Sequence, residues 1–365
     1  MTCAGTPSWK HDNAGGVGVS GAGGTFPTSS LSLALTMGEP AGIGGELALK
    51  AWLARGDGAL PAFFSLDDAD RLRALGRSLG LDVPIQVIHA PEEAVKHFAQ
   101  ALPVLSVPLP EEVLPGHPSA ANGRAVQSSI ERAVRFALDG RVLGVVTNPI
   151  HKSVLYAAGF RHPGHTELLG ELTGSDGVMM LTCPGLRAVP LTVHCALREV
   201  PGLLSTDLIV SRGELVAHAL ADDFGINRPR LAIAALNPHG GEDGALGKEE
   251  QEIIEPAAAK LRESGYDILG PLPADTLFHV GARALYDAVL CMYHDQALIP
   301  LKTIDFDRGV NVTLGLPIVR TSPDHGTAFD IAGQGVANPA SLIEALKQAA
   351  QIACRRGAQS LPHSA

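Results

Sequence analysis

LSLALTMGEPAGIGGELALKAW (31–52) decides the fold class of this chain, because an apolar run passes into a glycine-rich loop and then into a helix. The run LSLAL is short and almost continuously apolar, which is typical of a strand buried on both faces of a sheet. Four glycines lie in the loop at 38–45, and the helical pattern begins near Glu46. A strand, a tight connection and a helix in this order predict an α/β unit.

The same order of elements recurs along the rest of the chain. Residues 122–138 have the apolar spacing of an amphipathic helix, and VLGVVTNP (142–149) follows as a strand and a loop. Three more apolar runs end in polar residues: AVPLTVH (188–194), LAIAALNPH (231–239) and DAVLCMYH (287–294). Strands of this kind that alternate with helices predict an α/β fold with mostly parallel sheets covered on both faces.

Length, charge and cysteine use limit the class of protein. The 365 residues suggest two domains, and the formal net charge of −10 argues against a general nucleic-acid binder. The five cysteines are scattered without a CxxC pair, which fits a reducing cytoplasm. No apolar run approaches the ~20 residues of a membrane span, so we expect no membrane partner. Residues 1–30 are rich in Gly and Ser and are interpreted as a flexible leader outside the fold.

Three histidines follow predicted strands. His194, His239 and His294 lie at or just beyond the carboxyl ends of the three runs given above. In open α/β sheets, ligands bind in the crevice outside those ends, so three strands could bring three imidazoles to one edge. Three neutral imidazoles suit zinc, cobalt or a similar divalent ion and leave positions open for substrate. The alternative is that they are unrelated polar residues in loops.

Positive residues follow the third of these histidines. The segment 293–328 contains Lys302, Asn311 and Arg320. Lys and Arg suit a phosphate, the first as a point charge and the second through its bidentate fork. Ordinary surface charge is the alternative interpretation.

A second candidate anion site lies in PGHTELLG (163–170). His165 and Thr166 precede a predicted helix there, and the N-terminus of a helix is a natural anion site. The alternative for Thr166 is that its hydroxyl only caps this helix.

Glycine-rich segments suggest close approach of the backbone to a ligand. HGTAFDIAGQGVANP (325–339) offers Asp330 and Asn338 as polar anchors beside its glycines, but it is not the GxGxxG fingerprint of dinucleotide sites. The loop at 38–45 is consistent with contact to a substrate or nucleotide and equally with a tight structural connection. Glycines alone do not decide between these interpretations.

Several motifs taken together resemble one enzyme family. They are GEPAGIGGE, TNPIHK, PGHTELL, LNPHGGEDG, GPLPADTLF, MYHDQALIPLK, GVNVTLGLPIVRTSPDHGTA and DIAGQGVANP. In this order, from about Leu31 to the C-terminal helix, they resemble the 4-hydroxythreonine-4-phosphate dehydrogenases of vitamin B6 biosynthesis. The stretch that begins HGTA also resembles the nucleotide loop of isocitrate and isopropylmalate dehydrogenases, which implies their two-domain fold with an active-site cleft between the domains.

The resemblance implies a metal site and a dimer. His194, His239 and His294 would hold one divalent metal ion (Zn, Co or Mg), with ligands from both subunits of a homodimer. Asp275 and Asp295 fall where the family has carboxylates near the metal, as proton acceptor or as an orienting residue.

The resemblance also implies the residues that bind substrate and cofactor. The small phosphorylated substrate would be bound by His165, Thr166, Lys302, Asn311 and Arg320, of which Lys302 is also a catalytic candidate. NAD or NADP would face His325, Gly326, Thr327, Ala328, Asp330 and Asn338. No role is assigned to the loop TNPIHK, because this loop varies between relatives.

The implied reaction is the oxidation of 4-phosphohydroxy-L-threonine, followed by loss of CO2. We expect a discontinuous nucleotide-binding domain at 31–148 plus 306–357, and a metal, substrate and dimerisation domain at 149–305. One alternative is a related dehydrogenase of D-threonate or D-erythronate phosphate, or of an aromatic dihydrodiol carboxylate. Another is a metal-holding dimer without catalysis, although such a protein would not need the candidate substrate and cofactor residues.

Overall fold

The computed structural model describes residues 30–359 except 57, 59 and 163, so nearly all of the predicted leader lies outside this part. One 12-stranded sheet passes through it, in the order β3-β4-β2-β1-β5-β12-β11-β6-β7-β10-β8-β9. The strands are β1 (Leu33–Thr36), β2 (Phe63–Leu66), β3 (Ile85–Ile88), β4 (Leu102–Leu105), β5 (Gly144–Val146), β6 (Val178–Cys183), β7 (Leu186–Pro190), β8 (Arg230–Ala234), β9 (Asp267–Leu272), β10 (Ala288–Cys291), β11 (Val310–Leu314) and β12 (Arg320–Pro323).

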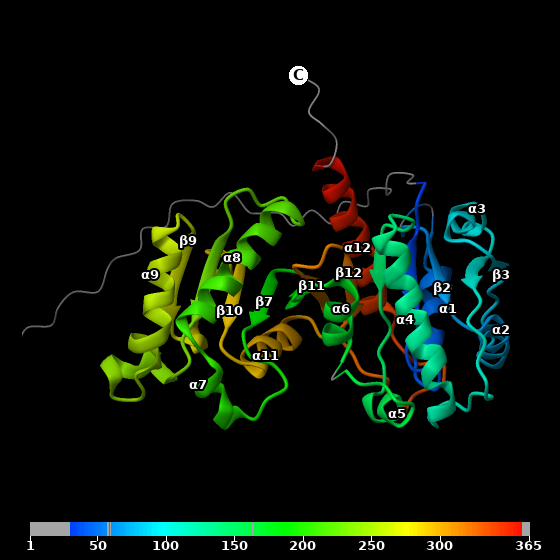
Figure 1. Cartoon of the computed structure of the whole chain (residues 1–365), viewed down its shortest axis with the longest axis horizontal. Coiled ribbons are helices and arrows are strands. Elements are labelled where there is room, and N and C mark those ends of the chain that lie inside the picture. Colours follow the sequence, from blue (N-terminus) through cyan, green and yellow to red (C-terminus); the bar gives the residue numbers. More distant parts are fainter. Residues whose placement is uncertain (1–29, 57, 59, 163, 360–365) are drawn as a thin grey trace, which may run out of the picture.

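Helices connect these strands and cover the sheet (Figure 1). They are α1 (Gly44–Leu53), α2 (Ala69–Ser78), α3 (Ala94–His97), α4 (Gly123–Leu138), α5 (Lys152–Ala157), α6 (His165–Thr173), α7 (Val200–Leu203), α8 (Thr206–Asp222), α9 (Glu255–Glu263), α10 (Val280–Arg283), α11 (His294–Ile304) and α12 (Ala340–Gln359). Short helical turns are η1 (Pro91–Glu93), η2 (Ala120–Asn122), η3 (Leu197–Glu199), η4 (Pro238–Gly244), η5 (Glu250–Ile254) and η6 (Ala274–Thr276). Within the described range, no helix has both the length and the apolar character needed to cross a membrane.

The predicted α/β class with a mostly parallel sheet is confirmed. The amphipathic pattern at 122–138 forms α4, which buries its apolar side and ends at Leu138. The first helix begins at Gly44, two residues before the predicted start. The apolar runs do form strands, but β8 ends at Ala234, because LNPH continues as a loop and not as strand.

Two parallel groups of strands run in opposite directions. β11 is antiparallel to both β12 and β6, and β6 is also antiparallel to β7. Three reversals separate β12 from β7, so the group β7-β10-β8-β9 runs opposite to the group that contains β1 and β5. β7, β10 and β8 are neighbours and parallel, as expected for the strands that precede His194, His294 and His239.

The order of strands follows the predicted division of the chain. The strands from 31–148 and 306–357 lie side by side from β3 to β11, and those from 149–305 follow from β6 to β9. β11 and β6 join the two groups by a continuous ladder, from Val310 opposite Thr182 to Leu314 opposite Val178. Figure 1 shows α12, in red, near the middle, with the blue strands on one side and the green and yellow ones on the other. The division into two domains remains a prediction.

The two faces of the sheet are covered differently. One face has a continuous apolar core, where α1, α12, α8 and α9 pack over strands from β4 to β9. The opposite face has two separate cores, one under α4 and the other under α11. This face is therefore less completely filled in the middle than at its two sides.

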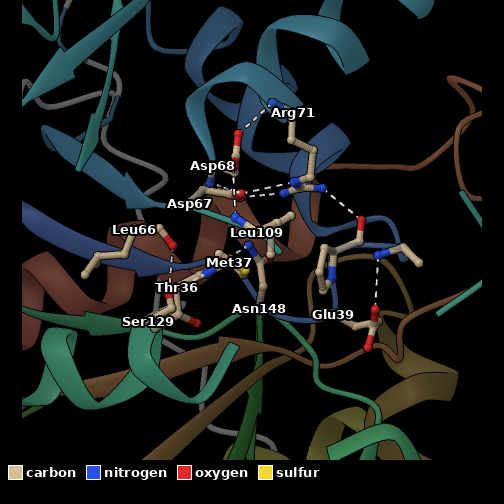
Figure 2. A network of polar contacts seen from close by, with 12 residues as sticks. Thr36, Met37, Glu39, Leu66, Asp67, Asp68, Arg71, Leu109, Ser129 and Asn148 are labelled. Carbon is tan, nitrogen blue, oxygen red and sulfur yellow. Dashed lines mark hydrogen bonds and ion pairs between the residues drawn. The ribbon is translucent and has the colours of Figure 1, made fainter. Parts of the chain in front are cut away.

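One buried hydroxyl links α4 to the first two strands. Ser129 Oγ accepts a hydrogen bond from the Met37 backbone N–H (3.0 Å) and donates one to the Leu66 carbonyl oxygen (2.8 Å). Ser129 is fully buried, so the Met37 N–H and the Leu66 carbonyl cannot form hydrogen bonds with water in its place. Figure 2 shows this link beside the ion pair of Arg71 with Asp67.

We predict that Ser129→Ala lowers the free energy of unfolding by about 1–3 kcal/mol, because two buried backbone groups lose their partner. Chemical denaturation would measure the change. The control is Ser128→Ala on the same helix, which is only half-buried and should change the stability by less than about 0.5 kcal/mol. Equal effects of the two substitutions would contradict this assignment.

Candidate active site

A cavity of about 380 Å³ lies over the middle of the sheet, and we call it the central cavity. Its floor consists of alternate residues of three adjacent strands: Met179 and Leu181 on β6, Asn311 on β11, and Arg320 and Ser322 on β12. Alternate residues of a strand point to the same face, so one face of the sheet forms this floor. The cavity therefore lies over the antiparallel strands, and not only outside the carboxyl ends of parallel ones.

Loops and helices from both parallel groups form the walls of the central cavity. From one side come Thr147 and Asn148, which follow β5, together with Lys152 at the start of α5. From the other side come His194, which follows β7, and His294 at the start of α11. Seven of the residues predicted from the sequence line this one cavity: His165, His194, His294, Asn311, Arg320, His325 and Gly326.

Arg320 is a buried cation on the cavity floor. Its side chain donates to the hydroxyls of Thr313 (2.9 Å) and Thr147 (2.7 Å), while its Nε is buried without a partner. No carboxylate of the described residues forms an ion pair with it, and burial lowers the pKa of its guanidinium to about 10. A buried charge is costly without a counter-ion, so this group is suited to an anionic ligand.

His165 offers a neutral imidazole to the same cavity. It is the first residue of α6, and its Nε2 is buried without a partner. Burial, together with the charges of Arg320 and Lys152, lowers the pKa of this imidazole to about 3. The N-cap position of α6 is Gly164, and the Thr166 side chain lies outside what the structure describes.

Further polar atoms at the central cavity have no partner in the protein. They are Asn311 Oδ1, Asn148 Oδ1 and His325 Nε2, all buried. Burial also lowers the pKa of the His325 imidazole, so its neutral form is favoured. Buried polar groups are normally hydrogen-bonded, and several unsatisfied ones around a single cavity indicate a polar ligand.

Lys302 lies behind one wall of the cavity and not in its lining. Its Nζ is 3.6 Å from Asp324 Oδ2, and Asp324 itself lines the cavity. Burial raises the pKa of the Asp324 carboxyl, although Lys302 opposes this effect. The predicted phosphate residues Lys302 and Arg320 are therefore not equivalent, because only Lys302 has a carboxylate partner within the described chain.

Two of the three predicted metal ligands lie together. The rings of His194 and His294 have centroids 5.9 Å apart, and Asp295 Oδ1 is 2.7 Å from His294 Nδ1. His239 is exposed on η4 and lines neither of the cavities that His194 and His294 line. Within the described part of one chain, no three His, Cys, Asp or Glu side chains are grouped closely enough to hold a metal ion.

Asp275 lies near the loop that carries His239 and does not line the central cavity. It is exposed on η6, which packs against η4. The sequence prediction grouped Asp275 with Asp295, but in a single chain the two carboxylates belong to different places. Asp295 contacts His294, whereas Asp275 lies near the loop of His239.

Backbone strain is concentrated in the predicted site segments. Among the described residues other than glycine, those with positive φ are His194 (41°), His239 (55°), Glu242 (43°), Asp243 (54°) and Ala328 (45°). Such conformations are unfavourable for residues with a Cβ atom and are often found at functional sites. Two predicted metal ligands and one predicted cofactor residue are among these five.

The two glycine-rich loops pack against each other. Ile43 N donates to the Thr327 carbonyl oxygen (3.1 Å), and a Cβ atom on Gly42 would lie 2.7 Å from that same oxygen. Gly38 has φ +66°, and a Cβ there would lie 2.6 Å from Asn148 Cβ. The loop at 38–45 thus lets Asn148 and the predicted cofactor loop (325–339) come close, which is consistent with the structural role considered from the sequence.

The predicted cofactor loop is fastened to α1. Lys50 Nζ donates to the carbonyl oxygens of Gly335 and Ala337, and Glu46 Oε1 accepts from Ala337 N (2.9 Å). Asn338 Oδ1 accepts from Ala340 N (3.0 Å), so the carbonyl of this side chain already helps to start α12. Asp330 is exposed.

Several cavity residues were missed from the sequence, although a signal for them was present. Thr147, Asn148 and Lys152 belong to the motif TNPIHK, to which no role was assigned. The useful signal was the position of this motif directly after a predicted strand, which is the argument applied to the three histidines. Asp324, in the motif SPDHG, also directly follows a strand, β12, and was missed although the same argument applies.

Comparisons with known proteins identify the family of this chain. Residues 62–349 match the family described as pyridoxal phosphate biosynthetic protein PdxA. The chain belongs to the PdxA family. A 4-hydroxythreonine-4-phosphate dehydrogenase of Bradyrhizobium diazoefficiens is 53% identical to it over 337 residues, or 89% of this chain and 97% of the relative. The corresponding protein of Erythrobacter litoralis is 54% identical over 327 residues, with the same two coverages.

Solved structures of PdxA relatives have the same fold. A 4-hydroxythreonine-4-phosphate dehydrogenase from Klebsiella pneumoniae is 38% identical, with a TM-score of 0.78, over 88% of this chain and 99% of that one. A terephthalate 1,2-cis-dihydrodiol dehydrogenase from Burkholderia xenovorans is 29% identical, with a TM-score of 0.59, over 88% and 98%. PdxA relatives with these names are dehydrogenases, so we classify this chain as an oxidoreductase.

We predict that His165 stays neutral from about pH 5 to about pH 8. Its pKa of about 3 lies below the ordinary 6.5, so the unfolded chain binds the proton first as the pH falls. The contribution of His165 to stability is therefore complete above about pH 6.5 and is lost as the pH falls from there toward 3. NMR titration of histidine-labelled protein would measure the pKa of His165, whose signal is assigned by its absence in His165→Gln. A midpoint between about pH 5 and about pH 7 would contradict the burial argument.

Proposed function

We propose that this member of the PdxA family oxidises 4-phosphohydroxy-L-threonine to 2-amino-3-oxo-4-phosphooxybutanoate in pyridoxal 5'-phosphate biosynthesis. The reaction depends on NAD or NADP and on a divalent metal ion, and the product then loses CO2 to give 3-amino-2-oxopropyl phosphate. The observation that most supports it is the buried Arg320, which has no carboxylate partner among the described residues and lies on the floor of a cavity lined with unsatisfied polar atoms. Close relatives are named for this activity.

The floor of the central cavity is suited to the anionic end of the substrate. Arg320 presents a guanidinium that is held in place by two hydroxyls, and Asn311 and His165 have unsatisfied atoms beside it. Because the side chains are already ordered, binding loses little conformational entropy at this end. Lys302 and Thr166 are assigned to the same substrate, with Lys302 held by Asp324 and ready to supply a second positive charge or a proton.

His194 and His294 fit the first two ligands of a divalent metal ion. Their rings are close, and Asp295 accepts from His294 Nδ1 in the way that carboxylates orient ligating imidazoles, leaving Nε2 for the metal. His239 is the third ligand in this proposal. When bound, the metal supplies positive charge beside the reacting oxygen, and the nicotinamide supplies the hydride acceptor.

A second copy of the chain completes the site in this proposal. His239 and Asp275 lie apart from the His194–His294 pair in one chain, so a homodimer would bring the two sets together across an interface. Large apolar side chains on α10, on α11 and just after α11 are exposed: Val280 (76%), Ile299 (64%) and Phe306 (73%). Such side chains favour burial against a partner. Asp275 would then be near the substrate as proton acceptor, while Asp295 orients His294.

The cofactor loop lies between two cavities, which supports a dinucleotide site. His325 and Gly326 line the central cavity, and Gly333 lines a second cavity of about 450 Å³ between α1, α2 and residues 109–115. The nicotinamide would lie at the first cavity and the adenosine toward the second. Arg71 also lines the second cavity but is paired with Asp67, whereas several carboxylates there would repel a 2′-phosphate, which favours NAD over NADP: Asp68, Asp70, Glu111 and Glu112.

The predicted division of the chain belongs to the same proposal. Residues 31–148 with 306–357 would hold the cofactor, and 149–305 would supply the metal ligands and the dimer contacts. The described cysteines, Cys183, Cys195, Cys291 and Cys354, are free thiols, which supports work in a reducing compartment such as the cytoplasm.

A related substrate is the second candidate. Arg320 binds a carboxylate as readily as a phosphate, and one solved relative is a dihydrodiol dehydrogenase at 29% identity. Turnover of 4-phosphohydroxy-L-threonine against 4-phospho-D-erythronate and an aromatic cis-dihydrodiol carboxylate decides between them.

We predict that the purified protein forms NADH from 4-phosphohydroxy-L-threonine and NAD, and that prior treatment with EDTA abolishes this activity until Zn²⁺ or Co²⁺ is restored. The near-ultraviolet absorbance of NADH measures the rate of this reaction before and after metal removal. Activity that persists after complete metal removal would discard the metal and keep the dehydrogenase. A folded, metal-loaded dimer without activity on this substrate would favour one of the related diols.

We predict that Arg320→Met lowers kcat/KM by about a hundredfold or more, since each charge-assisted hydrogen bond contributes roughly 1.5–3 kcal/mol. The melting temperature should change little, because removal of a buried charge without a counter-ion in the described chain offsets the loss of the hydrogen bonds to Thr147 and Thr313. The control is Arg187→Met, which removes a half-buried arginine that donates to the Asp287 carbonyl oxygen and does not line the cavity. A stability loss with unchanged kcat/KM for Arg320→Met would show a structural role.

A further inference from the structure

The loop that presents His239 has an unusual backbone. All five residues from His239 to Asp243 have positive φ, between 43° and 81°. Only Gly240 and Gly241 adopt such angles without strain, so His239, Glu242 and Asp243 each oppose this conformation. Something outside the loop has to hold it, because an exposed segment would otherwise relax.

The group that holds this loop is the carboxylate of Glu250. It lies on the π-helical turn η5 and is 2% exposed. Its Oε1 accepts from the backbone N–H groups of Leu236 and Asn237 (both 2.8 Å). Its Oε2 accepts from Asn237 Nδ2 (2.9 Å), which also donates to Glu249 Oε2 (2.7 Å), so the two backbone bonds are the ones that Glu250 alone makes. Leu236 and Asn237 are the last residues before η4, so the carboxylate fixes the point at which the strained loop begins.

Close approaches show that the loop wraps tightly around this carboxylate. A Cβ atom on Gly241 would lie 2.7 Å from Glu250 Oε2, and one on Gly247 would lie 2.4 Å from Asn237 Nδ2. Within the described residues, no Lys or Arg forms an ion pair with Glu250. Its charge is therefore balanced by N–H donors alone, and these donors come from the residues just before the loop.

We propose that Glu250 is a positioning residue for His239. By binding Leu236 and Asn237, it keeps the loop in the one backbone conformation that turns the His239 imidazole toward its ligand. The part of this inference that concerns a metal rests on the proposed function. The part that concerns the loop conformation does not.

The experiment compares four variants of the full chain. Glu250→Ala removes all three hydrogen bonds, whereas Glu250→Gln keeps one acceptor oxygen. His239→Ala removes the imidazole and leaves Glu250 in place. Glu252→Ala is the matched control, since Glu252 is an exposed residue of the same type on the same turn. Hydrogen exchange of peptides within 235–247 and the affinity for Co²⁺, read from its visible absorption, are measured for each.

We expect Glu250→Ala to raise exchange within 235–247 by roughly tenfold or more while the rest of the chain keeps its protection. Its Co²⁺ affinity should fall roughly 10–100-fold, as for other residues that orient a ligand. Glu250→Gln should show a smaller change in both. His239→Ala should lose Co²⁺ affinity without faster exchange, and Glu252→Ala should match the unchanged protein.

The outcomes separate this inference from the proposed function. Wild-type exchange within 235–247 in Glu250→Ala overturns the positioning role. The positioning role is also overturned if Glu250→Ala keeps its Co²⁺ affinity while His239→Ala has lost Co²⁺ affinity. If His239→Ala binds Co²⁺ normally, the metal assignment fails, and the exchange data alone decide on Glu250. If Glu250→Ala does not fold, the same two measurements on Glu250→Gln decide.

Discussion

The structure is organised around a charge that has to stay buried at the junction of three strands. Arg320 begins β12, and its guanidinium is held by Thr313 of β11 and by Thr147 just after β5. Two hydroxyls satisfy part of its hydrogen-bonding capacity but none of its charge. The uncompensated positive charge of Arg320 therefore favours binding of an anion at the antiparallel strands in the middle of the sheet. His165, Asn148 and Asn311 line the same cavity as this cation.

The reversal of β11 and β6 explains why a cavity exists at this point. Helices return along a parallel sheet and cover it, as α4 and α11 do on this face. Between them, the connections from β6 to β7 and from β11 to β12 contain no helix, so these strands supply none to cover the floor. Loops from two oppositely directed groups then reach the opening from either side, and they supply Asn148 and Lys152 from one and His194 and His294 from the other.

Local patterns predicted much of the fold and part of the site. The period of residues 122–138 predicted α4, and the polar ends of three apolar runs predicted that His194, His239 and His294 follow neighbouring parallel strands. The pairing of β6 with β11 joins residues more than 100 positions apart, and no local pattern specifies it. For the same reason, the sequence could not show that His239 and Asp275 lie apart from the other site residues within one chain.

The strained histidines have a consequence for how this enzyme could be stabilised. At His194 and His239 a glycine would relieve the backbone, so selection for heat resistance alone would favour replacing the two side chains that we propose as metal ligands. Under that proposal, stability and turnover are opposed at two specific φ angles. Engineering for durability would have to begin elsewhere, at positions where the folded backbone already suits its residue.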